Sequence, residues 1–147
     1  MRIIHALEDI PSQDCDGIFL AGPTPRDDNT PSWRPEALKI LKDMDYQGVV
    51  YVPESRNWQP HGDYTGQVEW EWAALDKATK IVFWVPRSLP TMPAFTTNVE
   101  FGLHAKSGKA ILGYPPQAEK MRYLDALAKR FDIPVFDALP KMLASLT

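Results

Sequence analysis

The chain has 147 residues, 44% of them hydrophobic, and this length fits one domain with a buried core, which we expect to cover residues 1–147. The formal net charge is −3 and no cationic stripe is present, which argues against polymeric nucleic acid or an anionic membrane as a partner. Cys15 is the only cysteine, which excludes an internal disulfide and a multi-cysteine zinc site and favours a reducing compartment, by default the cytoplasm.

The first sixteen residues carry four acidic side chains instead of the basic start and apolar stretch of a targeting signal. No apolar run in the chain approaches the roughly 20 residues that a membrane span needs. We therefore expect no targeting signal and no membrane segment.

Short β-branched or aromatic runs then alternate with longer amphipathic stretches, which is typical of parallel strands joined through helices. Runs such as "VVYV" and "IVFWV" are apolar throughout, as strands are when helices cover both faces of their sheet. The run Arg2–Ala6 could add an edge strand. The five predicted strands are Gly17–Ala21, Val49–Val52, Ile81–Val85, Ala110–Leu112 and Pro134–Phe136.

The first predicted helix, Ser32–Asp45, has apolar residues at helical spacing and Pro35 in its first turn, where proline is tolerated. The same periodicity predicts four more helices. The result is an α/β fold in which helices cover both faces of a mainly parallel five-stranded sheet. These four helices are Gly66–Thr79, Thr97–Ser107, Gln117–Phe131 and Ala138–Leu146.

Three connections that follow strands are rich in proline, polar residues and aromatics: Gly22–Pro31, Pro53–Thr65 and Pro86–Thr96. All three leave the carboxyl edge of the predicted sheet. Open α/β sheets bind ligands at this edge, because the loops diverge there and helix N-termini point into the gap. We therefore expect the functional site between these loops.

Glu100 is the first candidate for chemistry, since its predicted place in the first turn of a helix puts its carboxylate beside that gap. A structural alternative stays open. Thr97-Asn98-Val99-Glu100 fits a capping box, in which Thr97 and Glu100 satisfy free backbone N–H groups at the helix start.

Glu71 is the second candidate. Helical spacing places it with Gln67, Ala74 and Leu75 on the stripe that faces the sheet, whereas Glu69 falls on a more solvent-exposed side of the helix. An inward carboxylate costs several kcal/mol unless it is paired or hydrogen-bonded, so a ligand or a structural partner such as Arg87 must satisfy it.

The segment "IFLAGPTPRDD" ends the first of the five strands with a Gly-Pro turn. Gly22 would allow a ligand to approach the backbone, and Thr24 and Arg26 could hold a ribose or a phosphate. The segment contains neither the P-loop pattern nor the dinucleotide-binding pattern. It could equally be only a turn.

Six segments between Ile18 and Pro116 resemble, in the right order, those of the nucleoside 2-deoxyribosyltransferase-like proteins. The most specific is "TTNVEFG", which is similar to the family segment that holds the catalytic glutamate. The segments are "IFLAGPTPR", "SWRPEAL", "VVYVPE", "QVEWEWAALDKATKIVFWVPR", "MPAFTTNVEFG" and "SGKAILGYPP".

This resemblance implies a flavodoxin-like or Rossmann-like three-layer sandwich, with Glu100 as the catalytic nucleophile and Glu71 as the second catalytic carboxylate. Family members commonly have an aspartate that grips the base about six residues before the nucleophile, where this chain has Ala94. The base contacts must then come from other residues. The expected substrate contacts are Gly22, Pro23, Thr24, Arg26, Glu54, Trp58, Phe95 and Asn98.

The resemblance implies an enzyme that cleaves or exchanges the N-glycosidic bond of nucleosides through a covalent glycosyl ester on Glu100. This mechanism needs Glu100 ionised at neutral pH, which the positive end of its helix would favour. It needs no metal or other cofactor. Homo-oligomers are also expected, because sites in this family borrow residues from a neighbouring subunit.

Two alternatives stay open. The first is a nucleoside 5′-monophosphate N-glycosidase, in which Thr24 and Arg26 bind the phosphate and water is the acceptor. The second is a non-catalytic nucleotide-binding module, which the missing aspartate at position 94 would suit.

Overall fold

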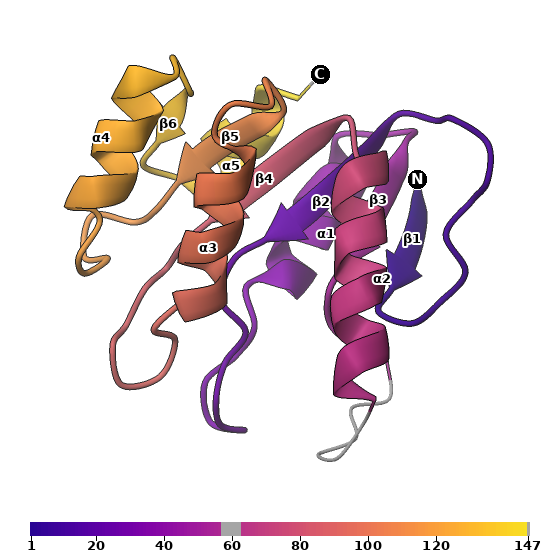
Figure 1. The fold of residues 1–147 in the computed structure, drawn as a ribbon, viewed down its shortest axis with the longest axis horizontal. Coiled ribbons are helices and arrows are strands. Elements are labelled where there is room, and N and C mark those ends of the chain that lie inside the picture. The colour runs from indigo at the N-terminus through magenta and orange to yellow at the C-terminus, as the bar shows by residue number, and fades with distance from the viewer. Residues whose placement is uncertain (57–62, 147) are drawn as a thin grey trace.

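The computed structural model describes residues 1–56 and 63–146, which form an α/β fold around a parallel sheet (Figure 1). Strands and helices alternate along most of the chain, as the sequence pattern predicts. In chain order the elements are β1 Arg2–His5, β2 Gly17–Ala21, α1 Arg34–Asp43, β3 Val49–Val52, α2 Tyr64–Lys77, β4 Lys80–Trp84, α3 Phe95–His104, β5 Ala110–Gly113, α4 Arg122–Arg130, β6 Val135–Phe136 and α5 Leu139–Ala144.

The sheet has six strands in the order β1-β3-β2-β4-β5-β6, and every neighbouring pair is parallel. Phe19 of β2 pairs with Tyr51 on one side and Ile81 on the other, so β2 lies in the interior of the sheet. All residues of β2, β3 and β5 are buried, and so are residues 81–85, so the prediction that "VVYV" and "IVFWV" are covered on both faces is confirmed. The prediction of five strands is one short, because Arg2–His5 forms β1 at the edge beside β3.

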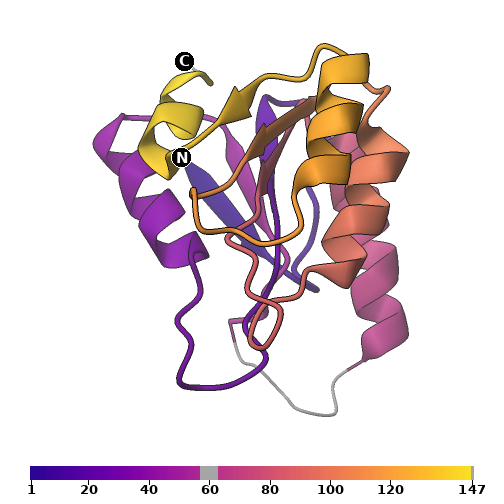
Figure 2. The same ribbon diagram turned by 90° about the vertical axis from the view of Figure 1, so that its left-hand side faces the viewer.

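Helices cover both faces of this sheet, as Figure 2 shows: α1 and α5 lie on one side and α2, α3 and α4 on the other. Successive strand residues point to opposite faces. Phe19 and Ala21 therefore pack under the three-helix layer, while Ile18 and Leu20 pack under α1 and α5. These two apolar layers hold the sheet between them and give the three-layer architecture.

Four predicted helix starts differ from the structure by two residues or more: α1 begins two residues later than predicted and α2 two residues earlier, and the starts of α3 and α4 have a visible cause in the backbone. Helix α3 begins two residues earlier than predicted, because Ala94 takes a left-handed backbone conformation (φ 61°) and opens the helix at Phe95. Helix α4 begins five residues later than predicted, because Lys120 is also left-handed (φ 55°) and interrupts the periodic pattern just before Arg122.

The chain reverses direction across the sheet at β2, since β3 pairs with one side of β2 and β4 with the other. The segments that leave β2 and β4 therefore diverge at the carboxyl edge, which is where open α/β sheets place their ligands. Within the described ranges, no helix combines the length and apolarity that crossing a membrane requires.

Candidate active site

A cavity of about 320 Å³ opens at this carboxyl edge. Its volume lies at the lower end of the range typical of small-molecule sites. Its walls come from the end of β2 and the following loop, the start of α1, the end of β3, the first half of α2 and the start of α3. The lining residues are Ala21, Gly22, Pro23, Thr24, Arg26, Arg34, Pro53, Tyr64, Gln67, Val68, Glu71, Pro93, Ala94, Phe95, Thr96, Thr97 and Glu100.

Glu100 lines this cavity from the second turn of α3, not from the first turn as predicted. The capping-box alternative is also wrong: Ala94 is the N-cap residue, so Thr97 already lies inside the helix and is buried. Among the described residues, none donates a hydrogen bond to the Glu100 carboxylate. The carboxylate therefore serves no cap.

Glu71 lines the same cavity from α2, one turn after Gln67. The Gln67 side-chain amide donates a hydrogen bond of 3.1 Å to Glu71 Oε1 and one of 3.4 Å to the carbonyl of Pro53. Arg87 is not the partner of Glu71: its guanidinium donates instead to the carbonyl of Lys120 and to Asn98 Oδ1. One amide thus ties Glu71 to the end of β3.

The two carboxylates share an environment that favours their protonated forms. Burial and, to a smaller extent, the negative charge of Glu71 together raise the pKa of Glu100 to about 7, against the opposing charge of Arg34. Burial also raises the pKa of Glu71, against the hydrogen bond from Gln67 and the charge of Arg34. A pKa of about 7 leaves Glu100 partly ionised at neutral pH in the empty cavity, because the favourable effect of a helix terminus fades within one turn and Glu100 lies beyond it.

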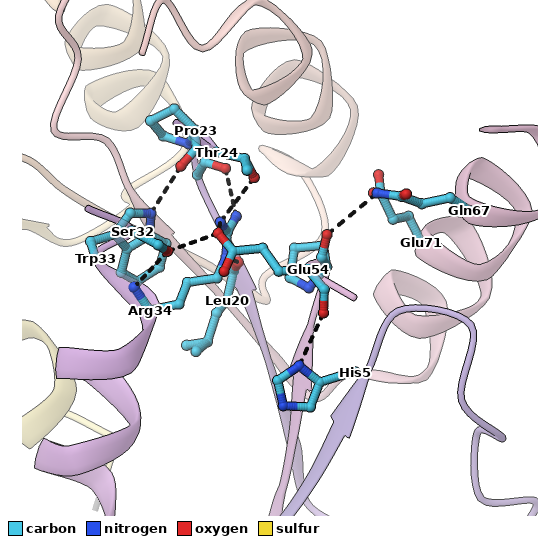
Figure 3. A network of polar contacts seen from close by, with 12 residues as sticks. His5, Leu20, Pro23, Thr24, Ser32, Trp33, Arg34, Glu54, Gln67 and Glu71 are labelled. Atoms are coloured by element: carbon cyan, nitrogen blue, oxygen red, sulfur yellow. Dashed lines mark hydrogen bonds and ion pairs between the residues drawn. The ribbon is translucent and has the colours of Figure 1, made fainter. Parts of the chain in front are cut away.

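Arg34 also lines the cavity, and it was not predicted as a site residue from the sequence. The residue is 1% exposed, and its side chain bridges three segments (Figure 3). Nε donates to the carbonyl of Leu20 at 3.0 Å and Nη2 to that of Gly22 at 2.7 Å, while Nη1 donates to Thr24 Oγ1 at 3.1 Å. Nη1 also makes an ion pair of 2.6 Å with Glu54 Oε1.

Glu54 is held in place from several sides. Besides the ion pair with Arg34, its Oε1 accepts a hydrogen bond of 2.8 Å from the Ser32 hydroxyl, and its backbone carbonyl lies 3.0 Å from His5 Nδ1. It does not line the cavity. The carboxylate predicted as a substrate contact thus neutralises the buried guanidinium beneath the site.

The loop after β2 brings four of the predicted substrate contacts to the cavity: Gly22, Pro23, Thr24 and Arg26. At Gly22 (φ 148°) an added Cβ would lie 2.1 Å from the carbonyl oxygen of Trp84, so glycine is required for the close approach of β4, a packing reason rather than a ligand reason. The Thr24 hydroxyl accepts from Arg34, and the Arg26 guanidinium lies 5.5 Å from the centre of the Phe95 ring.

The remaining predicted contacts have different locations. Phe95 lines the cavity and is 67% exposed at its rim. Asn98 is exposed on the outer side of α3 and bonds Arg87, so the structure does not bring it to the cavity. Trp58 lies outside the described residues.

No group of three or more histidine, cysteine or acidic side chains within residues 1–56 and 63–146 is arranged to hold a metal ion. Burial lowers the pKa of His104, which favours its neutral form. The polar groups of the cavity are thus two carboxylates, two guanidinium groups, amides and hydroxyls.

A family model described as "Nucleoside 2-deoxyribosyltransferase like" matches residues 16–118. This segment contains all the residues that line the cavity, from Ala21 to Glu100. A comparison with curated proteins finds no match.

Proposed function

The chain belongs to the nucleoside 2-deoxyribosyltransferase-like family, and we propose that it is an enzyme that breaks the N-glycosidic bond of (deoxy)nucleosides, with Glu100 as nucleophile and Glu71 as the group that holds or protonates the base. The observation that carries this proposal is the placement of both carboxylates in one cavity. Their pKa values are raised, as is common for groups at catalytic sites.

In the first step, ionised Glu100 attacks the anomeric carbon from about 3 Å while the bond from that carbon to the base nitrogen breaks. Positive charge develops at the sugar carbon, and the carboxylate stabilises it before it forms a glycosyl ester. The electron pair of the broken bond stays on the base, which leaves with a proton donated by Glu71. In the second step, a second base or water attacks the same carbon and gives a proton to Glu71, while the ester bond breaks and its electron pair leaves with the Glu100 carboxylate.

Two neighbouring carboxylates disfavour each other's ionisation, so the ionisation of one makes the other hold its proton more tightly. In the proposed mechanism Glu71 carries the proton and Glu100 the negative charge when the sugar is bound. Glu100 has a pKa of about 7 in the empty cavity. A sugar with developing positive charge beside it would favour its ionised form.

A specific observation favours a second candidate, a nucleoside 5′-monophosphate N-glycosidase. Ala94 has no side-chain oxygen to cap α3, and Ala94 to Thr97 line the cavity with Arg26 close to Phe95. Uncapped backbone N–H groups at a helix start and a guanidinium can bind a phosphate. Thr24 is less available for phosphate, because its hydroxyl accepts from Arg34.

The test is chromatography of nucleosides, deoxynucleosides and their 5′-monophosphates, each incubated with the protein with and without a second free base. We expect release of the base from at least one substrate. A new nucleoside that forms only with the second base indicates transfer, whereas free sugar or sugar phosphate indicates hydrolysis. Tight binding without any product contradicts the enzymatic proposal and favours a binding module.

Substituting Glu71 by glutamine should lower turnover by about 10²-fold, because the base then leaves without a positioned acid. The pH optimum should also move to lower pH, since the negative charge of Glu71 raises the pKa of Glu100 and its removal lowers that pKa. Initial rates from pH 5 to 9 measure both effects. The matched control is Glu69→Gln on the exposed side of the same helix, which should behave as the parent; equal rates in the two variants would exclude Glu71 from the mechanism.

We further propose that two copies of the chain associate through α2 and α3. Tyr64, Val68 and Trp72 form one stripe at intervals of four residues along α2, and Phe95, Val99 and Leu103 form another along α3. Five of these six side chains are more than 60% exposed, and three of the six line the cavity. A second copy that packs on these stripes would bury them and would form one side of the cavity.

Leu103→Glu should convert this dimer to a monomer, because it places a charge in the apolar contact. Light scattering coupled to size-exclusion chromatography should give twice the chain mass of 16.6 kDa for the parent and the single chain mass for the variant. Tyr123→Glu is the control, since Tyr123 is 74% exposed on α4, a helix that contributes to neither stripe. A monomeric parent would refute the proposed contact.

A further inference from the structure

Arg34 is the least exposed charged residue at the cavity, and no part of the mechanism above uses it. A buried guanidinium costs several kcal/mol unless it is paired and hydrogen-bonded. Here three hydrogen bonds and the hydrogen-bonded ion pair with Glu54 hold it in one place. Most of the N–H donors of this side chain therefore hold the positive charge in a fixed position at the cavity.

The anchors of Arg34 are the segments that shape the cavity. Its partners are the carbonyl at the end of β2, the loop after β2, and Glu54 directly after β3 (Figure 3). The guanidinium also lines the cavity that Glu71 and Glu100 line. A lysine at this position could not make the same forked set of contacts, since only the guanidinium offers five donors in fixed directions.

The charges around the two carboxylates are few. Among the described residues, the ionisable side chains that line the cavity are Arg26, Arg34, Tyr64, Glu71 and Glu100, with Glu54 behind Arg34. Arg26 and Tyr64 are exposed, so solvent screens them. Arg34 is the buried cation, and its charge lowers the pKa values of both Glu71 and Glu100.

We propose that Arg34 is a positioning residue: its anchored guanidinium holds one fixed positive charge in the cavity that Glu71 and Glu100 line, and this charge keeps the nucleophile Glu100 ionisable. This rests on the proposed function for its catalytic meaning. Without the charge, both buried carboxylates would hold their protons more tightly, and less of Glu100 would be ionised at neutral pH. Glu54 then limits how strongly the guanidinium acts on the pair.

The experiment is a ¹³C NMR titration of the glutamate side-chain carboxyl carbons, with Glu100 and Glu71 assigned by the loss of one signal in each of Glu100→Gln and Glu71→Gln. In Arg34→Met we expect the pKa of Glu100 to rise by about one unit above the parent value, because a nearby opposite charge is removed. Arg34→Lys keeps the positive charge but lacks the forked arrangement of guanidinium donors. In this variant most of the rise in the pKa of Glu100 should be absent. At pH 7 the ionised fraction in Arg34→Met then falls about fivefold, and turnover falls with it and recovers at higher pH.

A merely structural role for Arg34 predicts lower stability in both variants and no change in the titration. An Arg34→Met protein that folds and titrates as the parent does overturns the proposal. If that variant does not fold, Glu54→Gln decides: it keeps an acceptor for Arg34 and Ser32 but leaves the guanidinium uncompensated, so the pKa of Glu100 must fall, and an unchanged value overturns the proposal. The titration needs no turnover, so an inactive parent refutes the proposed function and leaves this test intact.

Discussion

Glu100→Gln abolishes release of the base in the proposed mechanism, with a loss on the order of 10³-fold or more, as is typical when the nucleophile of a covalent mechanism is removed. Glutamine keeps the size of the side chain and its place in α3. Its neutral amide cannot form the glycosyl ester or stabilise positive charge at the anomeric carbon as a carboxylate does. The measurement is the initial rate of base release on the best substrate of the panel, with circular dichroism to show that the fold persists.

The covalent intermediate gives this prediction a second readout. Parent protein quenched in acid during turnover should show a mass increase of one sugar unit, and peptide mapping should place it on Glu100. The Glu69→Gln control should retain both the rate and the adduct, because Glu69 is exposed and lies outside the cavity. A Glu100→Gln rate within tenfold of the parent would end the proposed mechanism.

Much of the fold was predictable because the signals are local. The apolar runs of β2, β3 and β4 and the periodicity with Pro35 in α1 depend only on neighbours in the chain. The left-handed residues Ala94 and Lys120 gave no such signal, since alanine and lysine rarely adopt this conformation. The wrong predictions for the starts of α3 and α4 follow from these two positions.

The carboxylates of the site were predictable, but their surroundings were not. Glu71 was selected by helical spacing, and Glu100 by its place after a loop at the carboxyl edge and by the family segment around it. Arg34 stands in the quoted segment "SWRPEAL", yet arginine is rarely buried, and its burial depends on Glu54, which is twenty residues away in the chain. The raised pKa of Glu100 depends on Glu71 from a different helix, a proximity that no local pattern reveals.

The same substitution, Glu100→Gln, should make the protein more stable at alkaline pH, and the sign follows from the pKa. In the unfolded chain Glu100 has a pKa near 4.5, and in the folded protein about 7. The folded state therefore binds the proton more tightly than the unfolded state does. The free energy of unfolding of the parent should fall as the pH rises from 4.5 to about 7, and this group should change it no further above that range.

Glutamine carries no titrating proton, so it removes this loss. Above pH 7 the variant should be more stable than the parent by up to about 3 kcal/mol, the free-energy equivalent of the shift in pKa, and the two proteins should converge below pH 4.5. Urea unfolding at pH 5 and pH 8 measures the difference, and Glu69→Gln should show none. If the free energy of unfolding has the same pH dependence in the parent and in Glu100→Gln, the pKa of Glu100 is not raised by burial and by the charge of Glu71. If Glu100→Gln is more stable than the parent and also loses turnover, the ionisable side chain at position 100 lowers the stability of the folded protein. Such a cost is expected of a residue that is needed for catalysis.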